Sequence, residues 1–236
     1  MGDAAPASGA SSEIPGKRVR LEDVAHDPTV IAYIEVADEY LGAIGYTEHG
    51  FRHANLVAHI AGSILRRLDY DERTVELGEM AGFMHDIGNC VGRELHSASS
   101  ALLARGVLGD LGVDPREIAQ VMNAMGNHEE EFGVPANPIG AATIIADKSD
   151  VHRTRVRNQS PQTFDIHDRV NSAAERSFVR VSDDDKTVTL ELTIDTEQAS
   201  VADYFNIFLP RMMFIKRSCD LLAVQFRLEI NQTRMI

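Results

Sequence analysis

The sequence predicts a mainly α-helical protein that carries a small α+β unit at its C-terminal end. Two patterns support this prediction. Between about residues 28 and 160, apolar residues recur at the three- and four-residue spacing of amphipathic helices. After about Pro161, apolar and polar residues instead alternate along short runs, as in strands with one buried face. A chain of 236 residues is long enough for one large domain, or for a medium domain with a small additional unit.

Composition and charge exclude several classes of protein. The formal charge of −13 argues against a general nucleic-acid-binding surface, which would carry a basic patch. The two cysteines, Cys90 and Cys219, make no disulfide framework and no Cys-x-x-Cys motif. No apolar run approaches the ~20 residues that cross a bilayer, and the N-terminus lacks the apolar segment of a secretory signal. We therefore expect a cytoplasmic protein with no membrane partner and no long nucleic acid as partner.

The N-terminal part of the chain divides into a leader and a series of helices. Residues 1–20 are largely Ala, Ser, Gly and Pro with little to bury, so we expect a disordered leader. Residues 21–165 form the predicted helical domain, whose first strongly periodic helix begins after Asp27-Pro28 and ends near Gly45. A second helix follows Gly50 and places His53 on the same stripe as its apolar residues.

Four more helices are predicted in this domain. The next runs from about Asp71 to Gly88, where glycine suits a helix end, and carries the pair His85-Asp86 close to that end. Another begins near His96, and the one after it begins at Asp114-Pro115, with Asp as the cap and Pro at the first helical position. The last of the four follows a Gly- and Pro-containing loop at residues 133–138.

The predicted C-terminal unit, residues 166–236, has the order strand, strand, helix, strand. Residues 178–181 and 187–194 are β-type runs around a polar turn at residues 182–186, so they predict a hairpin. A helix from about 201 to 222 and a strand from 224 to 230 complete the unit. Such an appendage is more often a scaffold than a catalytic centre, and we expect two copies of the chain to pair through it.

Six residues that can bind metal fall on the apolar sides of the predicted helices. Each histidine alone would be an ordinary buried histidine more often than a ligand. Burying a polar group without a partner costs roughly 1–3 kcal/mol, however, and a shared metal would supply partners for all of them together. Imidazole and carboxylate suit Mn, Fe, Mg, Ni or Zn. The six residues are His53, His85, Asp86, His96, His128 and Asp147.

The order His53, then His85-Asp86, then Asp147 on successive helices resembles the HD superfamily of metal-dependent phosphohydrolases. The resemblance covers roughly residues 28–160 and implies an HD-type helical domain. It implies that one divalent ion is held by His53, His85 and Asp147, with Asp86 as a bridge to a second ion.

His96 and His128 resemble the additional ligands of the superfamily members that carry two metals per chain. The resemblance implies that metal-bound hydroxide cleaves a phosphate ester or anhydride of a small substrate, expected to be a nucleotide. Asp86 and Lys148 are then the expected catalytic residues, with Lys148 supplying positive charge for the phosphate. For Arg155 and Arg157, a solvated basic helix end is the preferred interpretation.

The sequence departs from this family pattern at three places. Asn89 stands where the family often has Lys, which favours an alternative function as a non-hydrolytic sensor of a nucleotide or second messenger. No Gly-Tyr-Pro motif follows His128, so cyclic-di-GMP is not the first expected substrate. Asn127 precedes His128 where a related branch pairs two histidines, so one ligand of the second ion is missing from the pattern. An iron-dependent oxygenase on the same scaffold is a further alternative.

Overall fold

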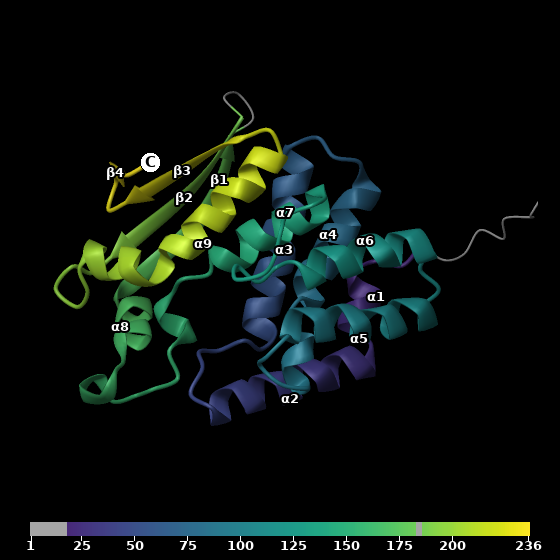
Figure 1. The fold of residues 1–236 in the computed structure, drawn as a ribbon, viewed down its shortest axis with the longest axis horizontal. Helices are drawn as coiled ribbons and strands as arrows, with labels where there is room; N and C mark the ends of the chain where they lie inside the picture. The colour runs from purple at the N-terminus through teal and green to yellow at the C-terminus, as the bar shows by residue number, and fades with distance from the viewer. Residues whose placement is uncertain (1–17, 183–185) are drawn as a thin grey trace, which may run out of the picture.

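The computed structural model describes residues 18–182 and 186–236. Most of the predicted leader and the centre of the predicted turn at 182–186 lie outside the described residues. The prediction of a mainly helical protein with a C-terminal α+β unit is confirmed (Figure 1). The helices before the sheet are α1 (Leu21–Ala25), α2 (Pro28–Ala43), α3 (Phe51–Arg67), α4 (Glu72–Met84), α5 (His96–Asp110), α6 (Pro115–Gly126), α7 (Pro138–Lys148) and α8 (Ile166–Ala173).

Acidic and amide side chains cap several of these helices, which is why the predicted helix starts agree with the structure. The Asp27 carboxylate accepts hydrogen bonds from the backbone N–H groups of Thr29 and Val30 at 2.8 and 3.2 Å. Asp71 and Asp114 cap α4 and α6 in the same way, and Pro115 occupies the first helical position of α6. Such caps satisfy backbone donors that have no partner inside the helix.

The helix that carries the His-Asp pair ends earlier than the sequence pattern predicts. α4 stops at Met84 rather than near Gly88, and a short 3-10 helix, η1 (Ile87–Cys90), continues the chain. The reason is a close approach between η1 and the start of α5. A Cβ atom at Gly88 would overlap the backbone carbonyl oxygen of His96, and the Gly88 N–H donates to the Ser100 hydroxyl at 2.7 Å. The sequence pattern also did not predict α1, α8 or the two-residue strand Thr233–Arg234 at the end of the chain.

The C-terminal unit is a mixed sheet with one long helix. Its elements are β1 (Ala174–Ser182), β2 (Thr187–Ile194), α9 (Val201–Leu221), β3 (Gln225–Ile230) and β4 (Thr233–Arg234). The described strands lie in the order β1–β2–β3–β4, and α9 connects the parallel pair β2 and β3. β1 and β2 form the predicted antiparallel hairpin, and β4 pairs antiparallel with β3.

The sheet and the helices share one apolar core. α9 contacts α7 as well as β3, and in Figure 1 it lies lengthwise along the sheet. Buried Phe208 and Ile215 of α9 belong to the same cluster as Ile145 of α7, Val57 of α3 and Leu190 of β2. The C-terminal unit is therefore packed directly against the helices that carry the predicted ligands. Within the described chain, no helix combines the length and apolarity that crossing a membrane requires.

The close contact at Gly88 yields a stability prediction. We expect Gly88→Ala to lower the free energy of unfolding by about 1–3 kcal/mol, because the added methyl group forces α5 away from η1. Gly106→Ala is the matched control, since that glycine is exposed on α5 with open space around its Cβ position, and it should be neutral or stabilising by about 0.5–1 kcal/mol. Urea denaturation followed by circular dichroism measures both. Equal stability of the two variants would contradict the proposed contact.

Candidate metal centre

The six predicted ligands come from separate elements and meet in the interior. α3 supplies His53 and α7 supplies Asp147, while α5 begins with His96. His85 is the C-cap residue of α4, directly after Met84, and Asp86 is the residue that precedes η1. His128 lies just after α6. The four histidines are buried, and the two aspartates are largely buried.

One group of donor atoms forms around His53 and His85. The Nε2 atoms of these two rings lie 3.2 Å apart. Asp86 Oδ2 lies 3.2 Å from the Nε2 of His85, and Asp147 Oδ1 lies 3.4 Å from the Nε2 of His53. Two nitrogen and two oxygen donors therefore face one point, and this arrangement could hold a divalent ion.

A second group forms on the other side of Asp86. The Nε2 atoms of His96 and His128 lie 3.1 Å apart. Asp86 Oδ1 lies 3.3 Å from the Nε2 of His96 and 3.5 Å from that of His128. Asp86 thus directs one carboxylate oxygen to each group, which is the position of a bridging ligand.

The hydrogen bonds of the four imidazoles show why these groups fit cations. The Nδ1 atom of each ring lies within hydrogen-bonding distance of a carboxylate or backbone carbonyl oxygen, and neither kind of oxygen can donate a hydrogen bond. Nδ1 therefore carries the proton, and Nε2 of a neutral ring presents a lone pair to the centre. The acceptors of His53, His85, His96 and His128 are the Asp150 carboxylate and the backbone carbonyls of Gly82, Arg93 and Met125.

Lone pairs that face one another repel unless a positive charge lies between them. Nitrogen and oxygen donors about 2.0–2.2 Å from one ion lie about 2.8–3.6 Å from each other at tetrahedral or right angles. The donor distances run from 3.1 Å between His96 and His128 to 3.6 Å between His85 and Asp147 and fall in that range, and the distance between His53 and Asp86 is slightly longer at 3.7 Å. The residues present therefore fit two divalent ions.

The electrostatics of the centre favour a bound cation. Burial alone would lower the pKa of His85, but the charges of Asp86 and Asp147 outweigh it and raise the pKa to about 10. Burial would raise the pKa of both carboxyls, yet His85 beside Asp86 and Lys148 beside Asp147 hold each pKa well below its usual range. Two ionised carboxylates in the interior thus draw positive charge to this point, as a proton or as a metal ion.

An aspartate that the sequence pattern did not single out supports the first group from behind. Asp150 Oδ2 lies 2.7 Å from His53 Nδ1, and Arg52 contacts the same carboxylate with two nitrogens at 2.7 and 3.3 Å. Burial would raise the pKa of Asp150, but Arg155, His53 and Arg52 keep it far below its usual range. A carboxylate behind a histidine ligand fixes the ring orientation and increases its basicity.

The basic residues near the end of α7 occupy different environments. Lys148 is buried, with its Nζ 2.6 Å from Glu130, 3.0 Å from Asp147 and 3.6 Å from Glu129. Arg155 is also buried, so the interpretation as a solvated helix end is wrong for this residue: it pairs with Asp150 and donates to a backbone carbonyl. Arg157 lies nearer the surface and pairs with the Asp38 carboxylate.

Asn89 and Arg93, which lie between the His-Asp pair and α5, each contact one of the predicted ligands. Asn89, at the position where the resembled family often has Lys, is buried and donates from Nδ2 to Asp86 Oδ1 at 3.1 Å. It therefore orients the bridging carboxylate. Arg93 lies against the ring of His96, with Nη1 3.3 Å from Nε2, and stacks on Tyr46 at 5.2 Å from the ring centroid. Neither contact is visible in a helical period, because both residues lie in or after η1.

Comparison with known proteins is consistent with this arrangement. A family model described as HD domain matches residues 50–205, which is more than half of the chain. The uncharacterized protein MJ1020 of Methanocaldococcus jannaschii is 26% identical over 182 residues, covering 66% of this chain and 68% of its own length. The crystal structure of a predicted HD superfamily hydrolase from an uncultured Thermotogales bacterium is 24% identical, with a TM-score of 0.43, over 54% of this chain and 69% of that one.

The hydrogen bond from His53 to Asp150 gives a testable consequence. We expect Asp150→Asn to weaken Mn²⁺ binding by roughly 10- to 100-fold, the range observed when outer partners of metal ligands are removed. Asp110→Asn is the control, because Asp110 is exposed at the end of α5. Isothermal titration of each folded variant with Mn²⁺ measures the effect. An unchanged affinity in Asp150→Asn would show that this carboxylate does not support the ligand.

Proposed function

Because this chain belongs to the HD domain family, we propose that it is a metal-dependent phosphohydrolase that cleaves a small phosphate ester or anhydride, of which a nucleotide is the expected form. The observation that carries the proposal is the position of Asp86. Its two oxygens face two separate pairs of imidazole nitrogens, one on each side. A pair of ions bridged in this way suits in-line displacement at phosphorus.

The chemistry of the proposal needs divalent ions at the centre. When bound, such ions lower the pKa of water to about 7 in favourable cases and stabilise both the attacking and the leaving oxygen. The protein's own residues provide the orientation. Asn89 and the backbone hold Asp86 between the two groups, and Asp150 fixes the ring of His53. The buried position of the ligands shields the centre from bulk water.

A cleft beside the centre provides space for a substrate. Its volume is about 410 Å³, which is within the usual range of small-molecule sites of about 300–1,000 Å³. It runs from the loop before α3, where His49 stacks edge-on against His53 with centroids 5.3 Å apart, to α8 and α9. A neighbouring hollow lined by His96 and Glu129 shares Tyr46 and Arg93 with it. The size supports a substrate of nucleotide dimensions rather than a polymer.

Arg93 is the cation best placed to contact a phosphate group. It lines both the cleft and the neighbouring hollow, and its guanidinium lies beside the metal-facing nitrogen of His96. Arg forks bind phosphate oxygens through two parallel hydrogen bonds. Lys148, by contrast, already has three carboxylates around its ammonium group. We therefore assign phosphate binding to Arg93 and charge balance beneath the centre to Lys148.

The proposal is tested by turnover of generic substrates. Full-length protein loaded with Mn²⁺ should hydrolyse a p-nitrophenyl phosphomonoester or phosphodiester, and Asp86→Ala should lose both turnover and metal while keeping a helical circular dichroism spectrum. Metal loading and nucleotide binding without any turnover, across nucleoside mono-, di- and triphosphates, would replace the enzyme with the sensor. Oxygen consumption with bound iron would replace it with an oxygenase.

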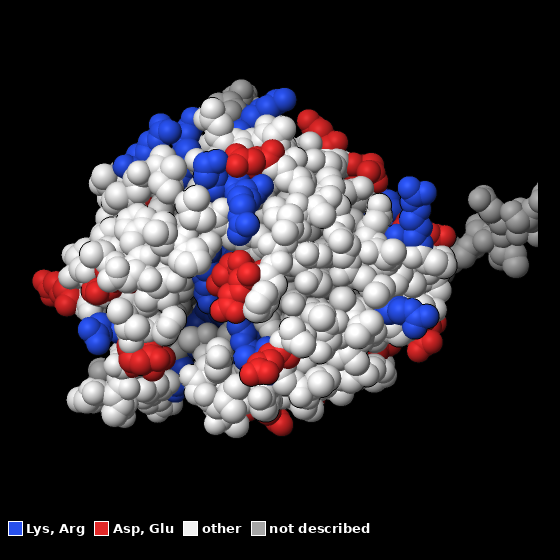
Figure 2. Space-filling model, in the orientation of Figure 1, with Lys and Arg blue, Asp and Glu red and all other residues white. Residues whose placement is uncertain are grey.

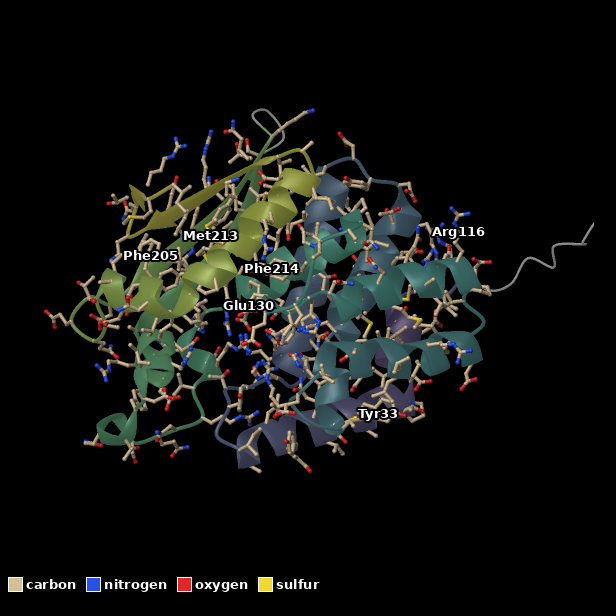
Figure 3. All side chains as sticks on the ribbon, in the orientation of Figure 1. Tyr33, Arg116, Glu130, Phe205, Met213 and Phe214 are labelled. Atoms are coloured by element: carbon tan, nitrogen blue, oxygen red, sulfur yellow. The ribbon has the colours of Figure 1, made fainter. Side chains whose placement is uncertain are left out.

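The role of Arg93 yields a separate prediction. We expect Arg93→Gln to lower kcat/KM by roughly 10- to 100-fold, because it removes a charged hydrogen bond worth about 1.5–3 kcal/mol, and to leave metal content unchanged when Mn²⁺ is in excess. Arg116→Gln is the matched control: Arg116 projects from the opposite end of α6 and lies away from the centre (Figure 3). Steady-state kinetics with elemental analysis distinguishes the roles. A loss of metal in Arg93→Gln would contradict a role confined to the phosphate.

A further inference from the structure

The carboxylate of Glu129 lies at the second group of donor atoms. Its Oε2 is 3.3 Å from the Nε2 of His96, which is the same separation as between His96 and the bridging oxygen of Asp86. The side chain is 16% exposed, so this carboxylate is mostly shielded from solvent. The first group contains four donors, whereas the second has only three without Glu129. Glu129 directly follows His128, whereas the histidine missing from the family pattern would stand on its other side, at Asn127.

The loop after α6 fixes this position. The chain folds back so tightly that the N–H of Gly133 donates to the carbonyl of Glu129 at 2.7 Å, and the Val134 N–H meets the Asn127 amide oxygen at 3.4 Å. A Cβ atom on Gly133 would overlap the carbonyl oxygen of Asn127, so only glycine permits this fold-back. His128 and Glu129 are thereby both held towards the centre.

The neighbours of Glu129 are those of a ligating carboxylate. Arg93 Nη2 lies 3.3 Å from Oε2, and Lys148 Nζ lies 3.6 Å from Oε1. Carboxylates that bind metal are commonly held by such outer partners. The charge balance points the same way: two divalent ions carry four positive charges, and Asp86 and Asp147 supply only two negative ones. Glu129 adds a third.

Glu130 provides a comparison within the same loop. Its carboxylate lies 2.6 Å from Lys148 and 3.2 Å from Arg211 of α9, and none of its described ion pairs involves a histidine. In Figure 3 this residue lies beneath α9, at the edge of the group of polar side chains. Two adjacent glutamates thus have different surroundings. Glu129 lies against His96 of the second group, and Glu130 connects α9 to Lys148.

From these contacts we propose that Glu129 is a ligand of the second divalent ion and supplies the fourth donor that Asp86, His96 and His128 leave open. The inference rests on the proposed two-metal function but concerns only the second site. In this arrangement the second ion is bound by Asp86, His96, His128 and Glu129, while Arg93 remains available at the rim for a phosphate.

Metal titration of the full-length protein tests the proposal without relying on activity. Metal-free protein is titrated with Mn²⁺ by calorimetry, its metal content is measured after dialysis, and Co²⁺ absorption spectra report the ligand set. Wild-type protein should bind two ions. Glu129→Gln should keep the first ion and weaken the second by at least roughly 10-fold, with a changed Co²⁺ spectrum. Glu129→Asp, which keeps the charge but withdraws the oxygen, should also weaken the second ion.

Two controls separate ligation from other roles. Glu130→Gln removes a charge and the contact with Lys148, and Glu131→Gln removes an exposed charge from the same loop; both should retain two ions. Two ions of unchanged affinity in Glu129→Gln would overturn the ligand assignment while leaving the two-metal function intact. Equal losses in Glu129→Gln and Glu130→Gln would also overturn it, because the role would then be structural. A wild-type protein that binds only one ion would refute the second site itself.

Discussion

Four imidazole lone pairs and two carboxylates converge in the interior, and the arrangement is stable only if positive charge lies among them. The Nε2 atoms of His53 and His85, and those of His96 and His128, lie 3.2 and 3.1 Å apart, while the Nδ1 atom of each ring lies against an oxygen acceptor. Nothing in an apolar core compensates such repulsion. The helices are therefore best understood as supports that bring six donor residues from five parts of the chain into two adjoining groups.

Charges around this centre are paired in successive layers. Asp150 lies behind His53 and is itself held by Arg52 and Arg155. On the other side, Glu129, Lys148 and Glu130 form alternating contacts that end at Arg211 of α9. Since unpaired buried charges are strongly unfavourable, each layer requires the next. Figure 2 shows the outermost part of this pattern, where acidic and basic side chains alternate along the middle of one face.

The pairing makes the C-terminal unit part of the site. α9 contributes Phe208 and Arg211 to the wall of the cleft, and α8 contributes Asp168 and Asn171. α9 shares an apolar core with α3 and α7, so the position of α9 relative to the ligands is fixed by packing. A unit that the sequence presents as a scaffold thus borders the space in which we place the substrate. The formal charge of −13 is compatible with this, because the cations that matter are local.

Local sequence signals determined the elements and the type of site. Helical periodicity, the capping residues Asp27 and Asp114, and strand alternation after residue 178 act over a few neighbours, so they can be read in order along the chain. The end of the helix near Gly88 was predicted too late, because its cause is the distant α5, and the short elements α1, α8 and β4 were not predicted. Polar residues on apolar helix faces likewise indicated a metal centre before any contact was known.

Tertiary structure alone decided which residues surround that centre. Asp150 meets His53 across 97 positions of sequence, and Arg211 meets Glu130 across 81. Arg93 and Glu129 lie outside any helix, where no period marks the direction of a side chain. Such partners depend on how helices pack and loops fold back, and a charged residue in a loop looks the same in sequence whether it faces water or a metal. Folding distinguishes the two, because only the buried one must find a partner.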